Sequence, residues 1–231
     1  MLTEAEVQRF EADGYLPLGQ VASDEQVAKL QEHLDDLTLG SKPNEQIQYQ
    51  IEPALRDKLG AAAGYDYIGP SPHYRKLTKL DRDPVFLEYF CHPTFLSLLE
   101  QLLGPEVTIS RAFALLKPAF DGSPLKWHQD AGPGHPAEPG QFVTIWTAMD
   151  EAQVENGALE ILPGTQELGL LQHRVQDGGS QLEVEADKRV GQEVPLPAKP
   201  GEAYLLNNYV LHRSGPNPTP HRRRALTLCY K

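Results

Sequence analysis

Two His-x-Asp tripeptides are the first candidates for chemistry in this sequence: His33-Leu34-Asp35 and His128-Gln129-Asp130. Residues i and i+2 project to the same side of a strand but to nearly opposite faces of a helix. The first tripeptide lies in a segment with helical periodicity, so we expect it to be helix surface. The second follows Trp127 in a region with strand-like patterns. Its histidine and carboxylate could therefore bind one metal ion.

A third ligand is available further along the chain. His212 ends the apolar run 204–212 and precedes the turn signal Gly215-Pro216-Asn217, so it also lies where a strand gives way to a turn. Two histidines and one carboxylate on separate strands match the ligand set of non-haem Fe(II) oxygenases, which leaves adjacent coordination positions open. Other histidines fit this pattern less well, and we interpret them as solvated or locally hydrogen-bonded: His33, His92, His135, His173 and His221.

Three consecutive arginines open the last predicted strand, 224–230. Strand alternation places Arg223 on a face whose other side chains (Ala225, Thr227, Cys229) are small, while the opposite face is rich in leucine. A planar guanidinium in a space lined by small side chains suits bidentate binding of a carboxylate. We therefore predict that Arg223 binds an anionic ligand and interpret Arg222 and Arg224 as exposed charges.

Helical signals dominate the first hundred residues. Thr3 and Glu6 have the spacing of a capping box, apolar residues at helical spacing follow Ser23, and Pro84 and Pro93 each open a short apolar segment. The sequence thus predicts four helices in 1–105. Residues 41–75 are polar, with interspersed glycine and proline, and we predict them to be irregular.

From residue 106 the pattern changes to short strands separated by turn signals such as Asn156-Gly157 and Pro200-Gly201. The predicted strands are 107–116, 142–149, 159–162, 192–196, 203–206 and 224–230. This pattern is typical of a two-sheet jelly roll or a related barrel. We expect one domain over 1–231, in which the helical part (1–105) covers one sheet of a jelly-roll core (106–231) that carries the metal site.

Charge and composition narrow the partners. Lys plus Arg is 21 and Asp plus Glu is 32, so the formal net charge is −11. Such a surface repels phosphate backbones and anionic lipids, so we expect neither nucleic-acid nor membrane binding. The start of the chain lacks the features of a signal peptide, no segment has the length and apolarity of a membrane span, and two cysteines make no disulfide framework. These features favour the cytoplasm.

The sequence resembles the phytanoyl-CoA dioxygenase family over most of its length. The motifs that carry the resemblance are Phe10–Tyr15, Trp127–Asp130, Thr144–Trp146, Glu155–Thr165, Pro200-Gly201, His212–Asn217 and Arg223–Ala225. The resemblance implies a mainly β fold with N-terminal helices, namely a double-stranded β-helix (cupin-like jelly roll) with helices packed on one sheet. It also implies an Fe(II)- and 2-oxoglutarate-dependent dioxygenase that uses O₂, hydroxylates a small-molecule substrate, and releases succinate and CO₂.

The resemblance also assigns roles to individual residues. His128, Asp130 and His212 fall on the family's iron ligands and are the catalytic centre, and Arg223 falls on its 2-oxoglutarate arginine. Further positions match residues that line the co-substrate pocket or contact 2-oxoglutarate: Ser214, Trp146, Phe113 and, as an upstream basic residue, Lys76. The chain departs from the family pattern at Thr165 and Gln166, where serine and histidine are usual, and at Arg213, where glycine is common.

Two alternatives remain open from the sequence. The same three ligands could hold zinc in a cupin-like isomerase or hydrolase, although such a site needs no buried arginine at this spacing. The other alternative is a non-catalytic jelly roll that only binds a ligand.

The Pro- and Gly-rich segment 131–140 and the polar segment 166–190 could act as lids over the site, or only as connectors. The substrate and the oligomeric state are not readable from the sequence.

Overall fold

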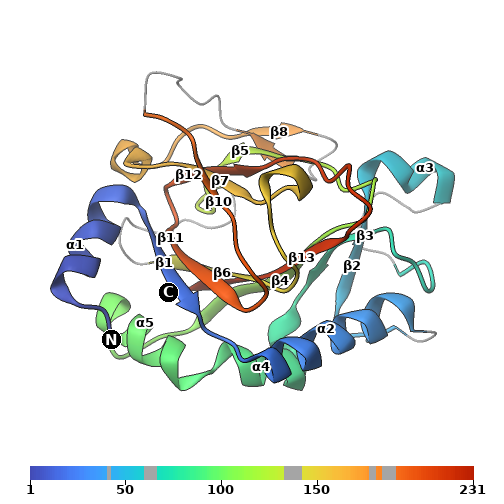
Figure 1. Cartoon of the computed structure of the whole chain (residues 1–231), viewed down its shortest axis with the longest axis horizontal. Coiled ribbons are helices and arrows are strands. Elements are labelled where there is room, and N and C mark those ends of the chain that lie inside the picture. Colours follow the sequence, from blue (N-terminus) through green and yellow to red (C-terminus); the bar gives the residue numbers. More distant parts are fainter. Residues whose placement is uncertain (41–42, 60–66, 133–141, 177–180, 184–190) are drawn as a thin grey trace.

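Two antiparallel sheets face each other in the computed structural model of the chain, and helices line the outer side of the larger sheet (Figure 1). The structure describes residues 1–40, 43–59, 67–132, 142–176, 181–183 and 191–231. The helices are α1 (Glu4–Asp13), α2 (Asp24–Leu39), α3 (Arg56–Leu59), α4 (Pro84–Phe90) and α5 (Pro93–Leu103), with short 3₁₀ turns at Pro53–Leu55, Leu80–Arg82, Val154–Asn156 and Thr165–Leu168.

The large sheet has seven strands in the order β1-β11-β6-β13-β4-β3-β2. Their bounds are β1 (Tyr15–Gln20), β11 (Glu202–Asn207), β6 (Val143–Ala148), β13 (Arg223–Tyr230), β4 (Ile109–Lys117), β3 (Tyr74–Thr78) and β2 (Gln48–Ile51). The small sheet has the order β10-β7-β12-β5, with bounds β10 (Val194–Leu196), β7 (Leu159–Leu162), β12 (Leu211–Ser214) and β5 (Leu125–His128). A separate hairpin joins β8 (Arg174–Gln176) to β9 (Gln181–Glu183).

The helix starts agree with their sequence signals. Thr3 and Glu6 form the reciprocal capping box of α1, and Gly14 ends that helix at φ 76°. Pro84 and Pro93 occupy the first positions of α4 and α5. The four predicted helices are therefore confirmed.

The two faces of the large sheet have different partners. Leu226 and Leu228 of β13 belong to a core cluster shared with α2, α4 and α5, whereas Ala225, on the other face of the strand, packs with residues of the small sheet such as Ile161. The core thus has two layers, one beneath the helices and one between the sheets. The mainly β fold with helices packed on one sheet is confirmed, and the six predicted strands form with small shifts at their ends.

The prediction for residues 41–75 was wrong. This segment contains β2 and the start of β3, which extend the large sheet beyond β4 and pair with each other and with β4. Buried tyrosines and isoleucines stabilise the pair: Ile47, Tyr49, Ile51 and Tyr74. The polar residues between them occupy the other face, so the alternation was present but masked by the surrounding glycines and prolines.

Within the described residues, no helix combines the length and apolarity that crossing a membrane requires.

Candidate metal centre

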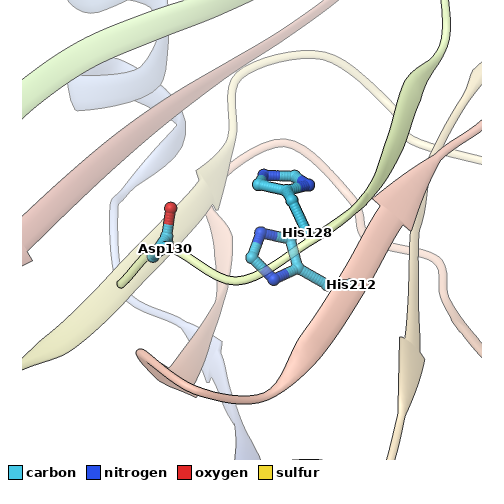
Figure 2. A group of neighbouring side chains, drawn as sticks. All are labelled: His128, Asp130 and His212. Atoms are coloured by element: carbon cyan, nitrogen blue, oxygen red, sulfur yellow. The ribbon is translucent and has the colours of Figure 1, made fainter. Parts of the chain in front are cut away.

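The three predicted metal ligands come together on two neighbouring strands of the small sheet. His128 ends β5, Asp130 lies two residues beyond it, and His212 is on β12 directly opposite His128 in the register. One ligand atom from each residue lies within 4.8 Å of the others. In Figure 2 the two imidazoles lie one above the other beside the Asp130 carboxylate; their ring centroids are 4.2 Å apart.

Each histidine has one nitrogen fixed by the backbone. Nδ1 of His128 donates to the Lys126 carbonyl at 2.8 Å, and Nδ1 of His212 donates to the Val210 carbonyl at 3.1 Å. A carbonyl can only accept, so both rings carry their proton on Nδ1 and keep the Nε2 lone pair for a metal. The i−2 carbonyl arrangement therefore prepares the two ligands in the same tautomer.

Asp130 is held by two side chains of the large sheet. Thr144 Oγ1 donates to one carboxylate oxygen at 2.7 Å, and an Arg111 nitrogen lies 3.4 Å from the other and donates to the Asp130 carbonyl at 2.9 Å. Burial opposes ionisation of this carboxyl, but His212 and Arg111 outweigh it, so the pKa of Asp130 is lowered to about 2. Burial, reinforced by His212, lowers the pKa of His128 to about 3. Both ligands are thus ready to bind a cation at neutral pH.

Arg223 lies on the inner face of β13, the face turned toward the small sheet. It is only 1% exposed, and its Nε and Nη1 atoms have no hydrogen-bond partner in the structure. Burial lowers its pKa to about 10, so the guanidinium stays charged at neutral pH. The Ser214 hydroxyl on β12 is likewise buried without a partner. Buried donors without acceptors are costly, which indicates that this space is built to receive an anion.

The remaining predicted pocket residues share the inner face of the large sheet. Phe113, Thr227 and Trp146 lie side by side in register across β4, β13 and β6. Lys76 on β3 places its Nζ 4.1 Å from the centroid of the Phe113 ring, and burial, followed by the charge of Arg111, lowers the pKa of Lys76 to about 8. All eight predicted site residues therefore belong to the two facing surfaces of the sheets.

These residues fit an iron ion and a 2-oxoglutarate molecule. Two free imidazole nitrogens and a carboxylate are a suitable donor set for Fe(II) that leaves positions open. The unpartnered nitrogens of Arg223 and the hydroxyl of Ser214 supply donors for a carboxylate at the far end of the space.

The three arginines nearest to Arg223 or His212 in the sequence (Arg213, Arg222 and Arg224) bind carboxylates. Arg224, interpreted from the sequence as exposed, is only 5% exposed and binds Asp150 through two nitrogens at 2.8 Å. Arg222 forms a bidentate pair with Asp35 of α2. The interpretation of Arg224 as an exposed charge was wrong, because the face of β13 that carries Arg224 packs against α2, which supplies Asp35 as an acidic partner. Arg213 pairs with Glu160 and Glu193 and lies over the Trp127 ring.

The two departures from the family pattern after the Pro-Gly turn have structural roles. Thr165 Oγ1 donates to the Leu162 carbonyl and accepts from the Leu211 amide, which ties β7 to β12 beside the metal centre. Gln166 donates to the carbonyls of Glu11 and Ala12 at the end of α1. Neither residue belongs to the metal centre.

Sequence reasoning missed three residues that support the site. Thr144 and Arg111 orient Asp130; strand alternation places both on the inner face of the sheet but does not show that they contact Asp130. Gln129, the middle of the tripeptide, is buried; it donates to the carbonyls of Gly169 and Tyr209 and accepts from the Leu171 amide. No local signal marks Gln129, because its partners are about 40 and 80 residues away.

The two candidate lids are described only in part. Residues 133–140 of the first segment lie outside the described residues, as do 177–180 and 184–190 of the second. The described start of the second segment contacts the metal centre, since His173 Nε2 accepts from the Gln129 amide at 3.2 Å. Their role as lids stays a prediction.

A jelly roll that brings two histidines and a carboxylate to one point, with a buried arginine across the pocket, defines the class of Fe(II)- and 2-oxoglutarate-dependent dioxygenases. The profile of the phytanoyl-CoA dioxygenase family matches residues 10–225. The chain belongs to that family.

Relatives and solved structures agree with this assignment. L-proline trans-4-hydroxylase of Streptomyces griseoviridis is 27% identical over 251 residues, which cover 99% of this chain and 86% of the relative. The structure of EvdO2 from Micromonospora carbonacea var. aurantiaca complexed with 2-oxoglutarate is 26% identical, with a TM-score of 0.73 and coverage of 100% and 91%. EctD from S. alaskensis shares the fold, with a TM-score of 0.75, 22% identity and coverage of 100% and 76%.

Proposed function

We propose that this dioxygenase hydroxylates a small-molecule substrate and converts 2-oxoglutarate to succinate and CO₂. The observation that carries the proposal is the buried guanidinium of Arg223, whose Nε and Nη1 atoms have no hydrogen-bond partner, on the face of the large sheet that is turned toward the sheet carrying the metal centre. A zinc hydrolase or isomerase gives no reason for a buried charge at that place. A metal centre together with a buried arginine is what an enzyme needs when one end of its co-substrate binds the metal and the other end is a carboxylate.

In this proposal His128, Asp130 and His212 hold Fe(II), and Arg223 with Ser214 binds the far carboxylate of 2-oxoglutarate. Bound iron supplies the activation of O₂ that the protein's side chains cannot perform. The chain's own residues orient and shield: Thr144 and Arg111 hold Asp130 in place. Phe113, Trp146 and Lys76 line the pocket, and the aromatic rings exclude water from it.

Two coarser expectations also enter the proposal. Residues 1–231 act as one oxygenase domain, which is supported by the pairing of β1 and β3 with strands from residues 106–231 and of β2 with β3. A reducing compartment such as the cytoplasm is supported by Cys91 and Cys229, which are both free thiols.

The test begins with anaerobic protein, Fe(II) and 2-oxoglutarate. A charge-transfer absorption band should form, and admission of O₂ should then release succinate. Arg223→Ala should lose the band at matched co-substrate concentration, and His212→Ala should lose iron binding. A wild-type protein that binds zinc and hydrolyses esters, but gives neither band nor succinate, would favour the hydrolase alternative. A protein that binds 2-oxoglutarate but releases no succinate with any substrate tested would favour the ligand-binding alternative.

A further inference from the structure

A buried lysine lies next to Arg223 and has no role in the site described so far. Lys117 ends β4 and stands directly opposite Arg223 of β13 in the register, so both side chains leave the same face of the large sheet. Lys117 is 3% exposed and Arg223 is 1% exposed. Two basic side chains thus lie side by side in the space between the sheets.

The stem of this lysine crosses toward the small sheet. A methyl group added at Gly157 would come within 2.8 Å of Lys117 Cδ and within 2.5 Å of the Gly215 carbonyl oxygen. Gly157 precedes β7, and Gly215 directly follows Ser214 at the end of β12. Lys117 therefore starts beside Arg223 on the large sheet and reaches toward the end of β12, where Ser214 lies.

The lysine is anchored but incompletely compensated. Its Nζ donates to the Ser123 carbonyl at 2.6 Å, and the Ser123 amide and hydroxyl both donate to the carboxylate of the fully buried Glu52. Burial, followed by the charge of Arg223, lowers the pKa of Lys117 well below its usual value, and Glu52 only partly opposes this. An anion placed between Lys117 and Arg223 would favour the charged form of the lysine.

We infer that Lys117 is a second cation for the far carboxylate of 2-oxoglutarate, acting beside Arg223 and Ser214. This inference rests on the proposed function, because it concerns the co-substrate of the same site. In this arrangement Arg223 and Lys117 approach the carboxylate from the large sheet, and Ser214 approaches it from the small sheet. Glycine is required at position 157 independently of the lysine, because its φ is 86° and a Cβ there would lie 2.5 Å from the Gly215 carbonyl oxygen.

The test separates the far carboxylate from the metal-binding end of the keto acid. Protein loaded with Mn(II), which binds the co-substrate without turnover, is titrated calorimetrically with 2-oxoglutarate and with 2-oxovalerate, a keto acid of the same length that lacks the far carboxylate. Lys117→Met keeps an unbranched stem against Gly157 and removes the charge. It should weaken 2-oxoglutarate binding by roughly 10- to 100-fold, the loss expected for one charged hydrogen bond, and change 2-oxovalerate binding less than about threefold.

The controls distinguish binding from structure. Lys199→Met, on the exposed surface, should leave both affinities unchanged. The double variant Glu52→Gln with Lys117→Met removes the buried carboxylate together with its cation, so it restores folding if the single variant melts early. The double variant should show the same reduced preference for 2-oxoglutarate as the single variant.

Three outcomes would overturn the inference: equal weakening of both acids, unchanged 2-oxoglutarate affinity, or recovery of the preference in the double variant, which would make Lys117 only the counter-ion of Glu52. Failure of the proposed function gives a different result, namely a wild-type protein that does not bind 2-oxoglutarate at all.

Discussion

At the scale of single residues, the metal centre depends on side chains that never reach the metal. Backbone carbonyls fix the tautomer of both histidines, and Thr144 fixes the carboxylate. Such supporting contacts set the geometry of ligands that would otherwise rotate. The affinity of the site for metal should therefore respond to substitutions of residues that hold the ligands in place.

Thr144→Val tests this dependence. The substitution keeps the β-branched shape and removes the donor to Asp130, so we expect metal affinity to fall by about 10- to 100-fold. Thr147→Val, on the same strand but on the opposite face, removes an acceptor for the Tyr89 hydroxyl and should lower stability without changing metal affinity. Fe(II) or Mn(II) titration of both variants gives the comparison; equal metal affinity in the two would contradict the supporting role of Thr144.

The lowered pKa of Lys76 leads to a prediction on the pH dependence of co-substrate use. Its pKa of about 8 lies below the usual 10.5, so the lysine loses its charge as pH rises through 8. If it attracts the co-substrate, kcat/KM for 2-oxoglutarate should fall above pH 8, because kcat/KM reports the free enzyme. Lys76→Met should have a lower kcat/KM that no longer falls in this range. The same fall in wild type and variant would assign the titration to another group.

The candidate metal ligands and Arg223 could be predicted from the sequence because each has a signal within its own segment. His128 and Asp130 are two residues apart at a strand end, and Arg223 follows from the alternation of one strand. Thr144, Gln129 and Lys117 could not be assigned in this way, because their roles depend on register between strands 14 to 106 residues apart in sequence. A pattern within one segment carries no information on that register.

At the scale of elements, β13 separates the two functions of the large sheet. Its leucines pack beneath the helices, and its arginine, alanine and threonine face the pocket. One strand thus supplies stability on one side and binding on the other. Substitutions at adjacent positions should therefore have different consequences.

Leu226→Ala and Thr227→Val should separate these consequences. Leu226 is completely buried among the helix-facing residues, so its truncation should lower the free energy of unfolding by about 2–5 kcal/mol and leave 2-oxoglutarate affinity unchanged. Thr227→Val should change stability little and alter co-substrate affinity, because the Thr227 hydroxyl is buried in the pocket without a partner. Urea unfolding and calorimetric titration of each variant measure both quantities, and parallel losses in the two would contradict the division.

The elements that the sequence predicted correctly have strong local signals, such as the capping box of α1 and the prolines at the starts of α4 and α5. Strands β2 and β3 have no such local signals. Its strands are four and five residues long and lie among glycines, prolines and polar side chains, and they gain their stability from burial against β4 and the tyrosine cluster. Tertiary packing decided their conformation, and packing is not visible in a single segment.

At the scale of the whole molecule, the space between the sheets leaves several buried polar groups without partners, among them atoms of Arg223, Ser214 and Thr227. Their burial lowers the stability of the empty protein. A ligand that supplies the missing partners binds only the folded state and must therefore stabilise it.

Metal and co-substrate should accordingly raise the melting temperature in two separable steps. At a free ligand concentration of about 100 times its Kd, the expected gain is about 2.7 kcal/mol for each ligand. Arg223→Met should retain the step due to Mn(II) and lose the step due to 2-oxoglutarate, and a chelator should reverse both in wild type. Thermal unfolding followed by circular dichroism measures the steps. A full co-substrate step in Arg223→Met would contradict the assigned anion site.

The pairing of β1 with β11 has a consequence for how the chain is made. Tyr15 lies beside Leu206, and the central strand β13 consists of residues 223–230. The first strand therefore has no partner in the large sheet until residues 202–207 have left the ribosome. Pairings between such distant segments form slowly. A nascent chain of this protein thus exposes unpaired strand edges until β11 and β13 have emerged, so its yield in cells should depend on chaperones that shield them.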